Sequence, residues 1–185
     1  MAVTTTSSKR LSDDVDEFTV DVADQIESFL IALGAVARGD FPGGSLSILL
    51  LEVSQLLLAG GRLGAVVDVV PTERFEPDAG VDPDADGLRE RLAELLGAAD
   101  EYVEVFDPYA AEVDIVHSRL SDDLSDVAAD LFHGLAHYQA GRANEALWWW
   151  QYSYLANWGS TASSALRALH SAVAHTRLDA GSDQQ

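Results

Sequence analysis

Four side chains with the chemistry of metal ligands recur on successive turns of one predicted helix, residues 121–141. Asp126, Asp130, His133 and His137 fall on one side of that helix, opposite its apolar packing face. Histidines at positions i and i+4 can chelate a single ion, and carboxylates can complete its coordination shell. The stripe could therefore hold a divalent metal, as a structural ion or in a metal-dependent enzyme.

A solvated stripe is the simpler interpretation of these four residues. Asp130 would then favour the charged form of a neighbouring histidine across one helical turn. Exposed carboxylates are common in a chain with 31 Asp and Glu. The sequence also lacks the H-E-x-x-H arrangement of zinc peptidases and the glycine-flanked serine of hydrolases. We therefore expect no cofactor and no enzymatic activity, and keep a divalent metal as the alternative.

The segment 143–159, "ANEALWWWQYSYLANWG", is the second candidate for chemistry because it concentrates the aromatic residues. Its large rings belong to Trp148, Trp149, Trp150, Tyr152, Tyr154 and Trp158. As a helix it would be apolar almost all round, which is typical of a central helix covered on several sides. Buried indole N–H and phenol O–H groups need partners, and Gln151, Ser153 and Asn157 are available. The rings are expected to form core, with an aromatic pocket for a cationic or ring-shaped ligand as the alternative.

Apolar residues at helical spacing predict the elements that must position both candidates. The expected helices cover residues 15–36, a segment from 45, residues 88–106, 121–141, a segment from 143 and residues 162–173. Gly159 and Ser160 would separate the last two as a C-cap and an N-cap. No alternating pattern typical of a strand stands out. The sequence thus predicts an all-α fold, an antiparallel bundle of five to six helices around a central Trp-rich helix.

A single helical domain is expected over residues 13–178. The small polar residues at 1–12 and 179–185 predict disordered tails. Residues 60–87 are rich in glycine, proline and aspartate, which predicts an acidic linker within the domain. Glu52 lies at the edge of the polar arc of its helix, so we expect it to be solvated.

Composition restricts the partners. The formal net charge of −20 would repel phosphate backbones and anionic lipid, so nucleic acid and membrane surfaces are not expected. The chain contains no cysteine, which fits a cytoplasmic protein. An excess of carboxylates also suits high intracellular salt, where screening relieves self-repulsion, so a halophilic or a high-GC source is our expectation.

Two stretches, "SDDLSDVAADLFHGLAHYQAG" and "WWWQYSYLANWGSTASSALRALH", together with "VEVFDPY", resemble a bacterial domain family of unknown function. The resemblance implies an all-helical fold and no assigned reaction. Histidines often flank the Trp-Gly pair in that family, whereas Asn157 and Thr161 stand around it here. Histidine chemistry at this place is therefore not expected.

Three functions remain open from the sequence. The leading hypothesis is a non-enzymatic helical interaction or scaffold domain that binds an unknown protein partner. The alternatives are a metal-binding bundle or metal-dependent enzyme using the Asp/His stripe, and a small-molecule binder with an aromatic pocket. Leu51 and Leu58 lie on the polar side of their helix, which indicates either that the helix packs on two sides or that it meets a second subunit in a homo-oligomer.

Overall fold

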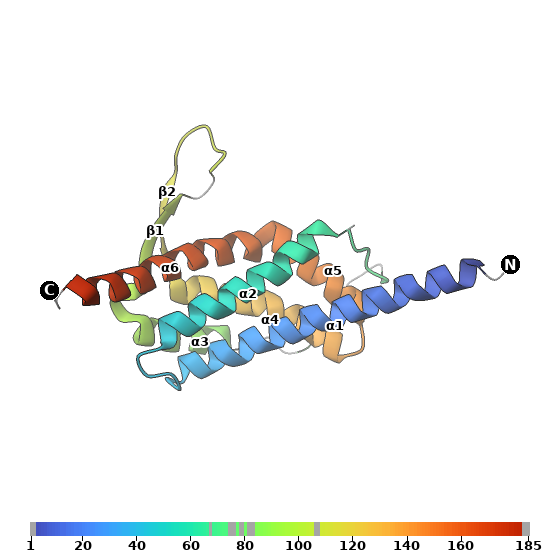
Figure 1. Cartoon of the computed structure of the whole chain (residues 1–185), viewed down its shortest axis with the longest axis horizontal. Coiled ribbons are helices and arrows are strands. Elements are labelled where there is room, and N and C mark those ends of the chain that lie inside the picture. Colours follow the sequence, from blue (N-terminus) through green and yellow to red (C-terminus); the bar gives the residue numbers. More distant parts are fainter. Residues whose placement is uncertain are drawn as a thin grey trace.

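The computed structural model describes residues 3–66, 68–73, 77, 80, 84–105 and 108–182. In chain order its elements are helices α1 (Val3–Ala37), α2 (Ser45–Ala65) and α3 (Ala85–Leu96), a 3-10 turn η1 (Gly97–Ala99), strands β1 (Glu101–Val105) and β2 (Ile115–Arg119), helices α4 (Leu120–Gln139) and α5 (Ala143–Ser153), a π-helical turn η2 (Tyr154–Trp158) and helix α6 (Gly159–Ser182). The predicted all-α bundle is confirmed, with one small two-stranded addition (Figure 1).

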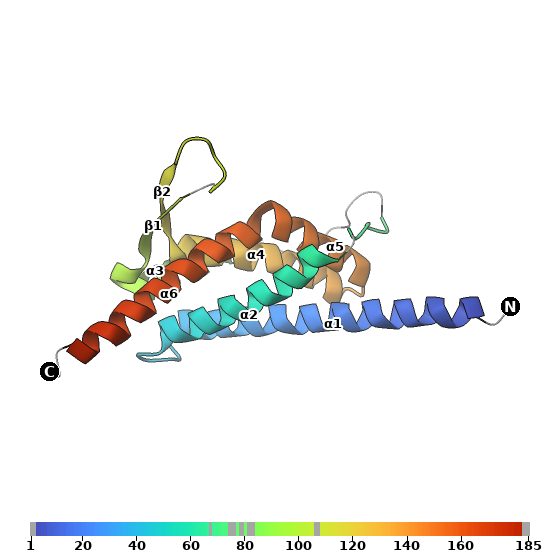
Figure 2. The ribbon, with the colours of Figure 1, turned by 45° about the horizontal axis from the view of Figure 1, so that its top comes forward.

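The long helices lie side by side and bury one apolar core between them (Figures 1 and 2). Helix α4 contacts α1, α3, α5 and α6, and α2 contacts α1 and α6. The core positions of α1 repeat every three or four residues, as the sequence predicts: Val22, Ile26, Phe29, Leu33 and Val36. The Trp-rich helix α5 is less central than expected, because Tyr152 is 55% exposed, and α4 has the larger set of helix neighbours.

Both predicted tails are partly helical. Helix α1 begins at Val3 and α6 continues to Ser182, so residues 3–12 and 179–182 extend helices that are packed elsewhere. Starting a helix costs free energy, whereas extending one adds a hydrogen bond for each residue that is fixed. Residues that form helices weakly can therefore be helical when they are next to a packed helical segment. The last residues, 183–185, lie outside the described part.

Helix α2 runs through the glycines that predicted the start of a linker. Gly60, Gly61 and Gly64 are all helical, and the helix ends at Ala65. A Cβ on Gly60 would stand 2.5 Å from Cε2 of Tyr154, so this glycine permits close packing rather than a turn. The predicted linker therefore begins after Ala65, and several of its residues lie outside the described part.

Helix α2 also differs from expectation at its polar side. Glu52 is half-buried rather than solvated, and burial raises the pKa of its carboxyl. Leu51 and Leu58 are 49% and 71% exposed.

By length and composition alone α2 could cross a membrane, a property that core helices of soluble proteins share. Its face from Leu49 to Leu63 is buried in the bundle.

A β-hairpin replaces the second half of the helix predicted at 88–106. Gly97 has a φ of 53°, which ends α3 in a backbone conformation that glycine adopts readily. Strands β1 and β2 then pair antiparallel, with Tyr102 opposite Ser118, and the hairpin projects from the bundle (Figures 1 and 2). Tyr102 is half-buried and Val103 exposed, in the alternation of a strand. Phe106 lies outside the described residues.

Asp100 joins this hairpin to α4. Its side chain is buried and accepts hydrogen bonds from the backbone N–H and the hydroxyl of Ser121, at 2.7 and 3.0 Å. The guanidinium of Arg119 pairs with the same carboxylate at 2.8 Å. The Asp100 side chain therefore satisfies the backbone N–H of Ser121, one of the open donors in the first turn of α4.

Helices α5 and α6 are continuous through η2. Gly159 has helical dihedral angles, with a φ of −64°, so it is neither a C-cap nor followed by an N-cap at Ser160. The π-helical turn instead carries Tyr154 and Trp158, whose rings contact each other with centroids 4.8 Å apart and pack on Gly60 of α2. The predicted break is thus a bulge in one long helix.

Candidate functional site

The aromatic residues of α5 and η2 divide into a core set and a surface set. Trp150 and Trp158 are fully buried. The indole N–H of Trp150 donates to the carbonyl of Leu131 at 3.1 Å, and that of Trp158 donates to the carbonyl of Trp150. These two rings have the satisfied polar groups that a packed indole requires, so they serve the core.

The surface set consists of Trp148, Trp149 and Tyr152, with His133 of α4 beside them; we call these four residues the aromatic surface. The rings of Trp148 and Tyr152 are stacked, with centroids 5.8 Å apart and planes inclined by 15°. The ring centroid of Trp149 lies 4.1 Å from that of His133 and 6.3 Å from that of Tyr152. Trp148 and Trp149 are half-buried and Tyr152 is exposed, so the rings form a continuous face that is accessible to solvent.

Hydrogen bonds between α4 and the α5–η2 segment hold this surface in place. The indole N–H of Trp149 donates to the carbonyl of Asp130 at 2.9 Å, and the side-chain amide of Asn157 donates to the Asp130 carboxylate at 2.7 Å. Burial raises the pKa of Asp130, while the bond from Asn157 opposes that shift. The close approach of the helices depends on Gly134, where a Cβ would stand 2.1 Å from Nε1 of Trp150.

The four residues of the Asp/His stripe have different partners in the structure. Asp126 pairs with Arg89 at 3.3 Å, and Asp130 is bound to Asn157. His133 packs on Trp149, and Nδ1 of His137 accepts from Nε of Arg142 at 3.1 Å.

The four side chains are therefore not gathered at one point in this structure, and they are not uniformly solvated. Among the residues that the structure describes, no group of three or more His, Asp or Glu side chains is arranged to hold a metal ion. His137 is fully buried, because α5 turns back onto this side of α4 after Gln139. A projection of the sequence onto a helix gives the direction of each side chain around the axis. It does not show which other element covers that side, so the burial of His137 could not be predicted.

Sequence reasoning missed a polar set on the other side of α5. The buried carboxylate of Glu145 accepts from the backbone N–H groups of Thr72 and Glu73, and these bonds lower its pKa despite the burial. Gln151 accepts from the N–H of Val69 at 2.7 Å, and Asn144 donates to the carbonyl of Val70. The signal for this set in the sequence was the presence of acid and amide side chains in a helix that is otherwise apolar. These side chains bind the segment that follows α2 to α5.

A protonatable carboxyl lies at the base of the hairpin. The phenol of Tyr102 donates to the carboxylate of Asp123 at 2.6 Å, and the hydroxyl of Ser118 donates to Glu104 at 3.1 Å. Burial raises the pKa of Asp123 from 3.8 to about 6, and the charges of Glu104 and Asp122 act in the same direction. Burial also raises the pKa of Tyr102.

We expect Asp123→Asn to raise the free energy of unfolding by about 1 kcal/mol at about pH 8, after allowance for solvent screening. Because the folded-state pKa lies above 3.8, the stabilisation from protonated Asp123 is complete below pH 3.8 and is lost as the pH rises through about 6. The advantage of the asparagine should therefore grow between these values and then level off. Chemical denaturation of both proteins at about pH 5 and about pH 8 measures it.

Asp122→Asn is the matched control for this prediction. Asp122 is adjacent on the same helix and pairs with Arg89 at 3.1 Å, so its neutralisation should give no gain at the higher pH. An equal gain from both substitutions would show a general relief of net charge, and the role assigned to the buried Asp123 carboxyl would be wrong.

The architecture is shared with a solved protein. The crystal structure of protein BF1032 from Bacteroides fragilis aligns with a TM-score of 0.69 and 21% sequence identity, covering 84% of this chain and 91% of that one. At that identity the similarity shows the fold alone. Among curated proteins, none matches this chain. The model of a family described as a domain of unknown function, DUF5063, matches residues 13–175, which confirms the resemblance to an uncharacterised helical family. This chain therefore belongs to the DUF5063 family.

Proposed function

We propose that this protein is a non-enzymatic interaction domain that binds an arginine-rich segment of a protein partner on its aromatic surface. The observation that carries the proposal is the stacked pair of Trp148 and Tyr152, with Tyr152 55% exposed. Large rings that are exposed side by side are a frequent feature of protein interfaces, where tryptophan and tyrosine supply much of the binding energy.

Charge supports a cationic partner. The net charge of −20 attracts basic segments and speeds their association at low ionic strength. A guanidinium group stacks on indole and phenol faces and is more weakly hydrated than an ammonium group. A segment rich in arginine therefore fits both features, while a lysine-rich segment of equal charge would match the net charge but stack less well on the rings.

The test compares nona-arginine with nona-lysine as probes of the aromatic surface. In a titration followed by NMR, nona-arginine should shift the indole N–H signals of Trp148 and Trp149 and leave those of Trp150 and Trp158 in place. Two exposed cation–π contacts contribute about 1–2 kcal/mol for arginine and less for lysine, so we expect nona-arginine to bind about fivefold more tightly than nona-lysine. Both affinities should fall as salt is added.

The double substitution Trp148→Ser with Tyr152→Ser should remove the preference for arginine. Tyr109→Ser is the control, because Tyr109 is 95% exposed in the turn of the hairpin and lies outside the aromatic surface. If the two peptides bind equally to the unmodified protein, or if the double variant keeps the preference, net charge alone explains binding and the proposal fails.

A further inference from the structure

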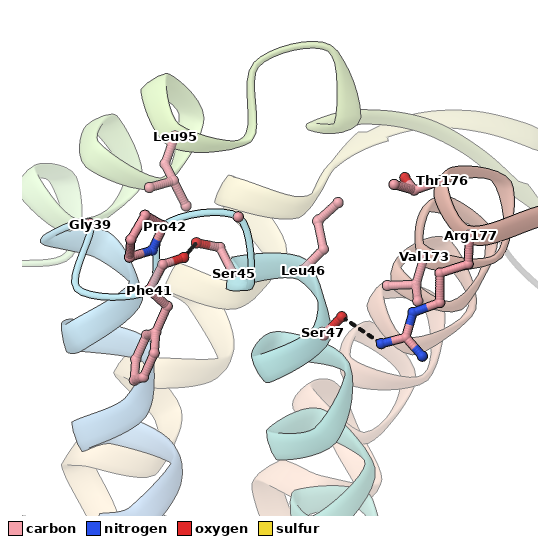
Figure 3. A pocket seen from close by; sticks show the side chains of 11 residues that line it. Gly39, Phe41, Pro42, Ser45, Leu46, Ser47, Leu95, Val173, Thr176 and Arg177 are labelled. Carbon is pink, nitrogen blue, oxygen red and sulfur yellow. Dashed lines mark hydrogen bonds between the residues drawn. The ribbon is translucent and has the colours of Figure 1, made fainter. Parts of the chain in front are cut away.

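We infer that a second site, distant from the aromatic surface, binds a small amphiphilic carboxylate. It is a cavity of about 470 Å³ between the α1–α2 loop, the start of α2, helix α3 and the C-terminal part of α6 (Figure 3). This volume lies within the range of small-molecule sites in proteins. The inference does not depend on the interaction proposed for α5.

The charge of the lining distinguishes this cavity from the rest of the protein. The chain has 31 Asp and Glu against 11 Lys and Arg, yet among the residues that the structure describes those lining the cavity include no acid, and their charged member is Arg177. The first turn of α2, which forms part of the wall, also contains no acidic residue. A local environment of this kind favours an anion where most of the surface repels one.

Arg177 is placed to receive an anionic group. Its guanidinium lies across from the start of α2 and donates to the hydroxyl of Ser47 at 3.2 Å (Figure 3). Other arginines of the chain, among them Arg38, Arg89 and Arg119, instead pair with aspartates. A guanidinium can bind a carboxylate through two parallel hydrogen bonds, and the Ser47 hydroxyl can donate a third. One cation balances one negative charge, so a carboxylate fits better than a phosphate.

The remaining lining suits an apolar body. Leu46 of α2, Leu95 of α3 and Val173 of α6 line the cavity, and Figure 3 shows Leu46 and Val173 on the side of Arg177 and Leu95 on the opposite side. Ligand sites commonly combine an apolar wall with a few polar groups that fix orientation. The ligand class is therefore a carboxylate on a short aliphatic or ring-shaped body.

The test uses octanoate as the probe, with octanol and octylammonium as neutral and cationic analogues of similar size. In an NMR titration of the full chain at low salt, octanoate should shift the signals of Leu46, Leu95 and Val173, and its chain should show NOEs to their methyl groups. Loss of the charge-assisted bonds in Arg177→Gln should weaken octanoate binding about tenfold. Arg167→Gln is the matched control, because Arg167 is exposed on the same helix and does not line the cavity, and this variant should bind octanoate as the unmodified protein does.

Two outcomes would overturn the inference. One is no shift at the lining residues with octanoate in the range of about 10 mM, the weakest affinity that still indicates a site. The other is binding of octanol or octylammonium at least as tight as that of octanoate, because the cavity would then select for apolar volume or for cations. The substituted arginine is exposed near the end of α6, so unchanged backbone signals elsewhere will show that the variant is folded.

Discussion

Asp100→Ala is expected to lower the free energy of unfolding by about 3 kcal/mol, because it leaves buried donors without their acceptor. The substitution removes the bonds to the N–H and hydroxyl of Ser121 and the ion pair with Arg119. The N–H of Ser121 lies in the first turn of α4, so the hairpin and the helix lose their main polar connection. Urea denaturation followed by circular dichroism measures the change.

Asp86→Ala separates this effect from the loss of a surface charge. Asp86 also pairs with an arginine, Arg89, but its side chain is 89% exposed, so its removal should change stability by less than about 0.5 kcal/mol. If Asp100→Ala were as mild as Asp86→Ala, Asp100 would not be the anchor of the hairpin.

Gly134→Ala should destabilise the protein by about 3 kcal/mol, through overpacking and the loss of a buried hydrogen bond. The added methyl group would overlap Nε1 of Trp150, whose N–H donates to the carbonyl of Leu131 on the same helix. Helices α4 and α5 must then move apart, which would also disturb the aromatic surface. Thermal unfolding followed at 222 nm gives the stability change, and tryptophan fluorescence reports the rearrangement.

Gly61→Ala is the control for this substitution. Gly61 is also helical, but a Cβ there would meet nothing within 4 Å. Alanine forms helices better than glycine, so this variant should be as stable as the unmodified protein or more stable by up to about 1 kcal/mol. Equal behaviour of the two alanine variants would contradict the close packing at Gly134.

The sequence predicts those parts of the fold that depend on local periodicity. The buried face of α1 repeats from Val22 to Val36 as expected, and α5 starts at Ala143, the residue from which the sequence predicts it.

The errors arise where one residue type has two uses. Gly60 and Gly64 resemble a chain break, but they are small so that Tyr154 and Trp158 can pack on α2. Tyr102 continues the helical spacing of α3, yet Gly97 ends the helix first and the strand partner lies on residues 115–119. In both cases a contact between segments that are distant in the sequence determines the structure, and the local pattern does not predict that contact.

The candidate site shows the same division. The pattern correctly groups Asp126, Asp130, His133 and His137 on one side of α4, but their partners come from α3, η2, α5 and the residue before α5. The six aromatic residues of 148–158 were treated as one set. The fold separates them into two buried indoles, Tyr154 packed on α2, and an accessible group of three, because neighbouring elements cover some faces of α5 and leave another open.

The bulge at η2 absorbs one residue between α5 and α6. A π-helical turn contains an extra residue relative to the α-helix around it. Deleting one residue there would restore a regular α-helix and leave α6 in nearly the same rotational phase, whereas deleting one from the regular first turns of α6 would rotate Leu169 by about 100 degrees away from its neighbours. Chain length is consequently more tolerant of change at the bulge than in the regular helix beside it, and related chains should be able to differ by this one residue while both ends of the rod keep their orientation.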